Sequence, residues 1–132
     1  MKEKVGLDTG FFVKLLAGSS EAVDVYGEIV RGEVIGVVSV IVVFELRRLA
    51  LRGLVDRAAY EVLERNWPVL FQVESVDREL ALEAASISHE SGLPSADALI
   101  YATCKKAGCD RFYTADLDFE VVSGKRPRIV FL

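Results

Sequence analysis

Four acidic residues are the side chains of this sequence best placed to carry out chemistry: Asp8, Glu45, Asp97 and Asp116. Asp8 and Asp116 each follow a short apolar segment, and the carboxyl ends of parallel strands meet at one edge of a sheet. Carboxylates gathered there raise one another's pKa and need a counter-charge. Mg²⁺ or Mn²⁺ would supply it, because these ions prefer oxygen ligands. Such a site would suit phosphoryl-transfer chemistry.

Each of these carboxylates also has a purely structural explanation. Asp8 and Asp116 can cap whatever follows their strands, because aspartate is common at such turns. Asp97, near a helix start, interacts favourably with the helix dipole. Glu45 can begin the polar side of a helix. Taken singly, each residue fits the structural explanation better, and only their combination points to a site.

The elements that would position these residues alternate between strand and helix. Short apolar segments predict strands at residues 5–9, 34–38, 69–73, 111–114 and 128–131. Helical spacing of apolar residues, with capping residues before and glycines after, predicts helices at residues 11–17, 21–30, 40–52, 56–65, 77–90 and 96–107. This alternation, with strands that are apolar on both faces, predicts an α/β fold with a mostly parallel sheet.

The uncharged run at residues 34–44 decides where Glu45 lies. Its 11 residues are too many for one strand, since strands usually have about 5–6. Ser39 offers a break, with a strand before it, a helix cap at its own position, and a helix from there through Arg52. Glu45, Leu49 and Arg52 would then lie along one face of that helix.

Composition limits the class of protein. The chain has 132 residues, 52% of them hydrophobic, which suits one domain, residues 1–132, with a full core. No uncharged run approaches the roughly 20 residues of a membrane-spanning helix, and the N-terminus lacks an apolar signal region, so we expect a cytoplasmic protein. The net charge of −4 excludes a simple cationic nucleic-acid binder, unless a metal ion supplies positive charge locally.

Zinc-type ligands are scarce. Cys104, Cys109 and His89 provide neither a second CxxC pair nor a histidine cluster, which argues against a structural zinc site. We expect two buried thiols. A disulfide between them would need an oxidising compartment or a hyperthermophilic host.

Four segments together resemble the PIN-domain nucleases, in particular the VapC-type toxins. They are residues 7–9, 39–46, 94–103 and 113–119, in this order and spacing, and the resemblance extends over essentially the whole chain. It implies a three-layer α/β/α fold and a metal-dependent endoribonuclease. It further implies that the acidic quartet is catalytic and holds Mg²⁺ or Mn²⁺: Asp8, Glu45, Asp97 and Asp116. Asp118 falls where some members carry a further acid, and Thr9 and Thr114 match hydroxyl residues that support the site.

The resemblance also implies partners: an RNA substrate, a cognate antitoxin and a second copy of the chain in a homodimer. The high hydrophobicity fits an apolar partner surface. Phe11, Phe12 and Trp67 are candidates for that surface, although core packing suits at least two of them better.

Four basic residues lie near the acidic motifs in the sequence: Lys14, Arg47, Arg48 and Arg52. Each can follow an RNA backbone or belong to a solvated helix face. The three arginines can equally contact an antitoxin or the second subunit. The sequence leaves these roles open.

Three other classes of protein share parts of this pattern. A PIN-domain nuclease of RNA processing has the same sequence pattern as a toxin. A phosphoacceptor receiver domain needs an acidic pair near the first strand and an aspartate closing the third, but Asp8 stands alone and Asp56 follows too short an apolar run. A haloacid-dehalogenase-type phosphatase needs a second aspartate two residues after the first, and Gly10 occupies that position.

Overall fold

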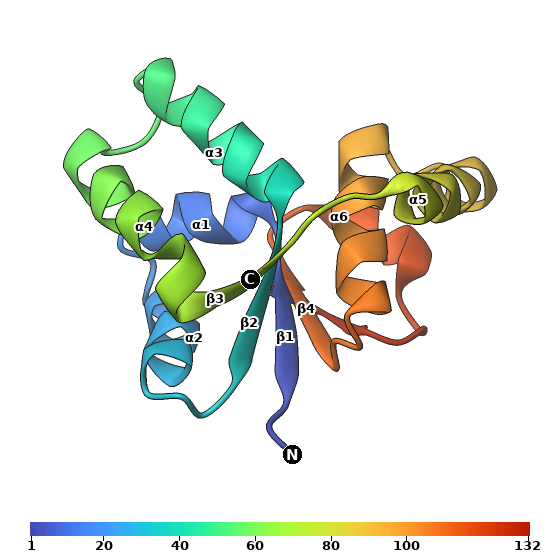
Figure 1. The fold of residues 1–132 in the computed structure, drawn as a ribbon, viewed down its shortest axis with the longest axis horizontal. Coiled ribbons are helices and arrows are strands. Elements are labelled where there is room, and N and C mark those ends of the chain that lie inside the picture. Colours follow the sequence, from blue (N-terminus) through green and yellow to red (C-terminus); the bar gives the residue numbers. More distant parts are fainter.

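A five-stranded, all-parallel sheet forms the centre of the computed structural model, which describes all 132 residues, Met1–Leu132 (Figure 1). Its order is β3-β2-β1-β4-β5. The strands are β1 (Lys4–Leu7), β2 (Ile35–Ser39), β3 (Phe71–Glu74), β4 (Arg111–Thr114) and β5 (Arg128–Phe131). Every pairing is parallel, so the predicted α/β fold with a mostly parallel sheet is confirmed.

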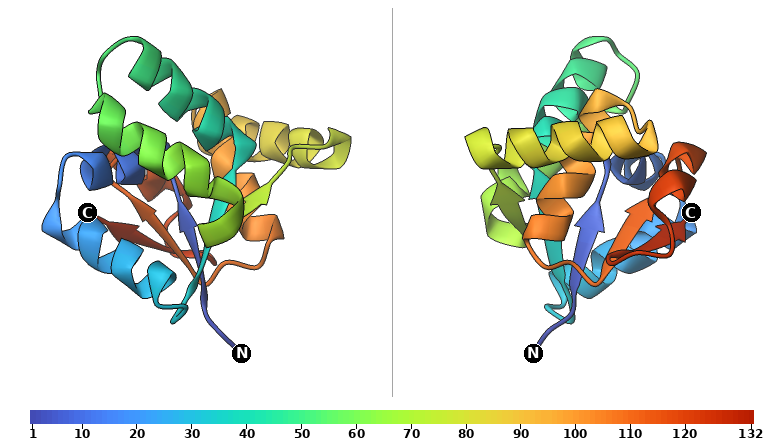
Figure 2. Two further views of the ribbon diagram at one scale, coloured as in Figure 1. Left: turned by 60° about the vertical axis from the view of Figure 1, so that its left-hand side comes forward. Right: turned by 90° about the vertical axis from the view of Figure 1, so that its right-hand side faces the viewer.

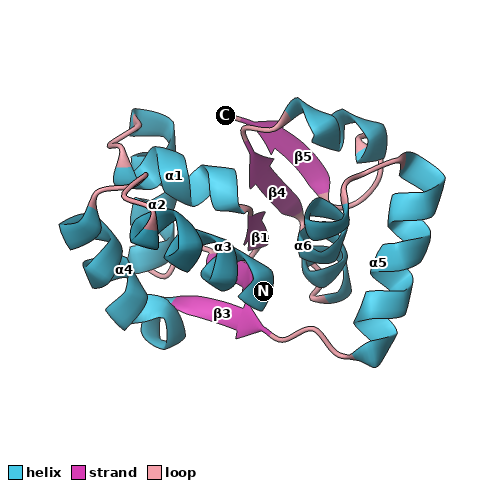
Figure 3. Cartoon of the chain, turned by 90° about the horizontal axis from the view of Figure 1, so that it is seen from above, coloured by secondary structure: helices cyan, strands magenta, loops and turns pink.

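Helices cover both faces of the sheet. They are α1 (Thr9–Leu16), α2 (Ser20–Val30), α3 (Val40–Leu51), α4 (Arg57–Leu70), α5 (Arg78–Ser91), α6 (Ser95–Lys106) and the short 3₁₀ helix η1 (Leu117–Val122). Helices α1, α2 and α4 lie on one side and α5 and α6 on the other, which gives the predicted three layers (Figures 2 and 3). Helix α3 continues from the end of β2 above the carboxyl edge of the sheet (Figure 1).

The strand order reverses next to β1. From β1 the chain proceeds outward through β2 and β3, then returns to place β4 on the other side of β1. Leu7 of β1 lies opposite Tyr113 of β4, so the two strands end at the same level. Ligands of open parallel sheets bind outside such a switch point, at the carboxyl ends of the strands.

An aromatic cluster fills the core between the sheet and α1, α2 and α4. The ring centroids of Phe12 and Trp67 are 5.1 Å apart, and that of Phe71 is 5.5 Å from Phe12 and 5.4 Å from Trp67. Phe11 stacks edge-on against Phe12. Phe11, Phe12 and Trp67 are all buried, so these three aromatic residues belong to the core.

Several predicted boundaries were wrong. The first strand ends at Leu7 and not at residue 9, because Asp8 caps α1 and α1 begins at Thr9. Helix α4 does not end near residue 65 but runs through Pro68 to Leu70, so β3 begins at Phe71 and not at residue 69. Proline removes one helix hydrogen bond and crowds the preceding turn, but buried Trp67 holds the last turn against the core.

Helix α6 begins one residue earlier than the sequence suggests. Pro94 occupies the cap position in an extended conformation, and Ser95 is the first helical residue with no capping side-chain bond. Asp97 is therefore the third residue of α6, still within its first turn. No helix of the structure has the length and apolar character needed to cross a membrane.

Gly6 lies in the central strand β1, at a point where β1 and α6 pack closely. A Cβ atom there would lie 2.6 Å from Sγ of Cys104 and 2.9 Å from Cδ1 of Phe112. We expect Gly6→Ala to lower the free energy of unfolding by about 1–3 kcal/mol through overpacking, measured by urea denaturation.

Gly27→Ala is the matched control. In helix α2 a Cβ at this position meets only the flexible guanidinium of Arg31, so helix propensity should raise the free energy of unfolding by up to about 1 kcal/mol. Equal effects of the two substitutions would contradict the close approach of β1 and α6.

Candidate active site

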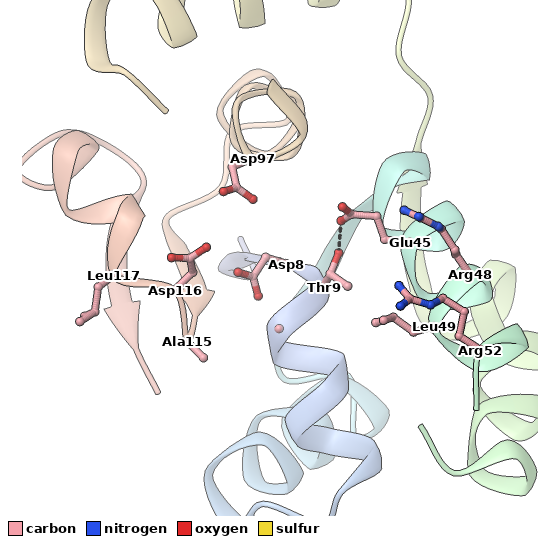
Figure 4. Close-up of a pocket in the computed structure, with 11 residues that line it drawn as sticks. Asp8, Thr9, Glu45, Arg48, Leu49, Arg52, Asp97, Ala115, Asp116 and Leu117 are labelled. Atoms are coloured by element: carbon pink, nitrogen blue, oxygen red, sulfur yellow. Dashed lines mark hydrogen bonds between the residues drawn. The ribbon is translucent and has the colours of Figure 1, made fainter. Parts of the chain in front are cut away.

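A cavity of about 650 Å³ opens at the switch point of the sheet (Figure 4). It brings together all four acidic residues that the sequence analysis singled out: Asp8, Glu45, Asp97 and Asp116. They come from four separate segments, since Asp8 follows β1, Glu45 lies on α3, Asp97 on α6, and Asp116 after β4. The remaining lining residues are Thr9, Gly10, Arg48, Leu49, Arg52, Ala115 and Leu117.

Asp8 is the buried member of this group, with only 4% of its surface exposed. Its Oδ1 accepts a hydrogen bond of 2.8 Å from the amide of Phe11, which caps α1, and its Oδ2 accepts one from the hydroxyl of Thr114. Burial raises the pKa of Asp8 from 3.8 to about 6, and the nearby carboxylates of Asp116 and Glu45 add to the rise while both hydrogen bonds oppose it.

Asp116 is joined to Asp8 through the same hydroxyl. The amide of Asp116 donates to Oγ1 of Thr114 at 2.9 Å, and that hydroxyl in turn donates to Asp8. One oxygen of Asp116 accepts from the amide of Asp118 at 2.9 Å and caps η1. Asp8 and Asp116 therefore cap the elements that follow them and also line the cavity.

Glu45 is held toward the cavity by two local features. Ser39 ends β2 and caps α3 by accepting a hydrogen bond of 3.1 Å from the amide of Ile41, as predicted. This start places Glu45 on the side of α3 that faces α1. There the hydroxyl of Thr9 donates a 2.5 Å hydrogen bond to Oε1 of Glu45 (Figure 4).

Asp97 points into the cavity from the first turn of α6 (Figure 4). Partial burial raises its pKa from 3.8 to about 6, with further contributions from the charges of Asp116, Asp8, Glu45 and Asp118. The carboxylates of Asp97, Asp116 and Asp118 each offer an oxygen within 4.8 Å of the others.

None of these carboxylates forms an ion pair with a cationic side chain. The ion pairs of the structure are Arg31–Glu33, Arg57–Glu61, Lys106–Asp77, Arg111–Glu3 and Arg126–Asp110, all outside the cavity. The donor set is made of carboxylate oxygens without thiolate or imidazole, and its members repel one another. These properties fit a hard divalent cation such as Mg²⁺ or Mn²⁺.

The structure adds residues that the sequence analysis did not single out. Gly10, Ala115 and Leu117 line the cavity because they adjoin residues that were singled out. Neighbourhood in sequence was the only available signal for these three positions. Asp118, which the family resemblance had marked as the place of a further acid, is not part of the lining but shares the carboxylate cluster.

The four basic candidates separate into two groups. Arg48 and Arg52 line the cavity, whereas Lys14 and Arg47 do not. Arg47 lies beside Tyr60 and Glu64 of α4, and these neighbours, Tyr60 above all, raise the pKa of its guanidinium.

The cysteines and the histidine lie away from the cavity. Cys104 and Cys109 are free, buried thiols, and His89 is exposed on α5.

Comparison with known proteins agrees with this architecture. A family model described as PIN domain matches residues 5–125. A VapBC complex from Rickettsia felis bound to a promoter DNA fragment has a TM-score of 0.76 at 11% identity, covering 98% of each chain. A DNA-bound VapBC from Salmonella typhimurium has a TM-score of 0.75 at 20% identity, covering 99% of this chain and 98% of that one.

A sarcin–ricin loop cleaving VapC toxin from Mycobacterium tuberculosis has a TM-score of 0.71 at 23% identity, covering 93% of this chain and 97% of that one. At such identities the likeness shows the fold. No curated protein sequence matches the chain significantly.

The raised pKa of Asp97 predicts how the stability of the metal-free protein depends on pH. Because the pKa of Asp97 is about 6 in the folded protein, against an ordinary value of 3.8, the folded protein binds more protons between these values, and stability falls as pH rises through this window. Asp97→Asn removes the charge. In the presence of a chelator it should raise the free energy of unfolding at pH 7.5 by about 1 kcal/mol, allowing for solvent screening.

Below pH 3.8 the difference should vanish, since Asp97 is then neutral in both states. The exposed Asp24 on α2 provides the control, because Asp24→Asn should leave this pH profile unchanged. A destabilising effect of Asp97→Asn at pH 7.5 would show that Asp97 is not held among like charges.

Proposed function

The chain belongs to the PIN domain family, and from that premise we propose that it is a metal-dependent endoribonuclease that hydrolyses RNA phosphodiester bonds. The observation that supports this most strongly is the meeting of four carboxylates in one cavity without an ion pair to any of them: Asp8, Glu45, Asp97 and Asp116. A carboxylate site of this kind suits a divalent cation and a phosphate ester substrate.

Asp8, Asp97 and Asp116 would hold the ion, with Glu45 as a further ligand or as a residue that orients one. Mg²⁺ or Mn²⁺, when bound, would lower the pKa of a water molecule and offset negative charge on the leaving oxygen. The four carboxylates carry a charge of −4 at neutral pH when ionised, which about two divalent ions would balance.

Hydrogen bonds within the chain hold several carboxylates of the site in position. Thr114 and the amide of Phe11 fix both oxygens of Asp8, and Thr9 fixes one oxygen of Glu45 and leaves the other free. The carboxylate of Asp97 has no hydrogen-bond partner in the chain, so both its oxygens are available to a ligand. Prearranged ligands of this kind reduce the reorganisation that accompanies binding and reaction.

We further propose that the chain is the toxin of a VapBC-type toxin–antitoxin pair, acting in the cytoplasm as a homodimer. The similarity to VapBC complexes and to a toxin that cleaves the sarcin–ricin loop supports this. An antitoxin is then the expected protein partner, and residues 1–132 act as one PIN domain. A PIN-domain nuclease of RNA processing is the alternative, and an antitoxin gene beside this one would favour the toxin.

The receiver-domain alternative has no support in the structure. Asp56 caps α4 through the amide of Ala59 and follows no strand. The third strand, β3, ends at Glu74 and is followed by Ser75, so no aspartate stands directly at its end where a phosphoacceptor would be needed.

Cleavage of a panel of RNAs with and without Mn²⁺ tests the proposed activity. Asp97→Asn should lower cleavage at least about 100-fold, since loss of a metal ligand removes several kcal/mol of transition-state stabilisation. Asp97 is preferred to Asp8 because Asp8 also caps α1 and bonds Thr114. Addition of a chelator should abolish the wild-type activity, and Mn²⁺ should restore it.

Asp24→Asn is again the control and should retain full activity. Wild-type protein that cleaves no RNA with Mn²⁺, or an Asp97→Asn variant as active as wild type, would contradict the proposed function.

A further inference from the structure

We propose that Arg48 and Arg52 form a phosphate-binding wall that holds the nucleotides next to the scissile bond. This inference rests on the proposed ribonuclease function and adds to it how the chain grips its substrate. The occupant is a single RNA strand, bound through backbone phosphates other than the one that reacts.

The two arginines share a wall of the cavity with Glu45. Arg48 lies in the last turn of α3 and Arg52 is its C-cap; four residues apart, they lie on one face, about one turn or 6 Å apart along the helix axis. In Figure 4 their side chains extend from this end of α3 on the side of the cavity opposite Asp97 and Asp116. The cavity therefore has aspartates on one side and, on the α3 side, two arginines beside Glu45.

Neither arginine forms an ion pair with another residue of the chain. Arg48 and Arg52 are exposed and take part in none of the ion pairs of the structure. The adjacent Arg47 differs, because it lies beside Tyr60 and Glu64 of α4. Arg47 therefore lies toward α4 and outside the cavity, whereas Arg48 and Arg52 line the cavity; Arg48 also borders the groove between Arg47 and Glu64.

The positive charge of the two arginines and their distance from the carboxylates indicate which ligand they bind. A guanidinium binds a phosphate through two parallel hydrogen bonds. Arg52 is seven residues beyond Glu45, which is about 10 Å along the helix axis, so a phosphate at Arg52 lies away from the carboxylates. Two cations at this position also favour the approach of RNA to a chain whose net charge is −4.

Binding of a fluorescein-labelled, mixed-sequence single-stranded RNA in Ca²⁺ tests this wall, with fluorescence anisotropy as the readout. The double variant Arg48→Gln/Arg52→Gln should bind at least about 10-fold more weakly than wild type. Loss of two phosphate contacts should also reduce the slope of log K against log salt by about 1.4, measured between about 50 and 200 mM.

Arg65→Gln/Arg78→Gln is the matched control, because it changes the net charge equally at two exposed arginines on α4 and α5. It should leave the affinity and the salt slope near their wild-type values. Arg48→Lys/Arg52→Lys should restore the salt slope but only part of the affinity, since lysine keeps the charge and loses the paired hydrogen bonds.

Cleavage in Mn²⁺ separates this inference from the proposed function. A dinucleotide has no phosphate besides the one that reacts, so Arg48→Gln/Arg52→Gln should lose much less activity on it than on longer RNA, where the loss should appear in KM. Unchanged binding of the long RNA, or an equal loss on the dinucleotide, would overturn the inference. Arginine-dependent RNA binding by a protein that cleaves no RNA would overturn only the proposed function.

Discussion

The sheet topology brings several carboxylates close together, where they repel one another. The rest of the site must compensate for this repulsion. Asp8 and Asp116 follow adjacent parallel strands, and α3 and α6 add Glu45 and Asp97 to the same cavity. The fold tolerates this concentration of charge by binding Asp8 and Glu45 through neighbouring hydroxyls and a backbone amide. None of these carboxylates forms an ion pair, and we propose that a divalent ion balances their charge.

The same side chains serve the fold and the site. Asp8 caps α1, Asp116 caps η1, and the hydroxyl of Thr114 joins the two. The structural explanation of these aspartates and the proposed functional one are therefore both compatible with the geometry. The capping hydrogen bonds fix the position of each carboxylate. The two carboxylates lie close together because both follow strands that meet at the switch point of the sheet.

The sequence predicted the features that depend on local patterns. The break at Ser39 fixed the start of α3 and with it the side of the helix on which Glu45 lies, as the structure confirms. The end of α4 was misplaced because burial of Trp67 outweighs the local effect of Pro68, and burial is a tertiary property. The separation of Arg47 from Arg48 likewise depends on α4, which sequence spacing does not reveal.

The central claim is that carboxylates from four segments form one divalent-cation site. Anomalous scattering from a crystal grown with Mn²⁺ tests it most directly. We predict a manganese peak coordinated by Asp8, Asp97 and Asp116, with Glu45 beside it, and loss of that peak in Asp97→Asn. A cavity without manganese, with the side chain of Arg48 or Arg52 turned in to pair with these carboxylates, would contradict it.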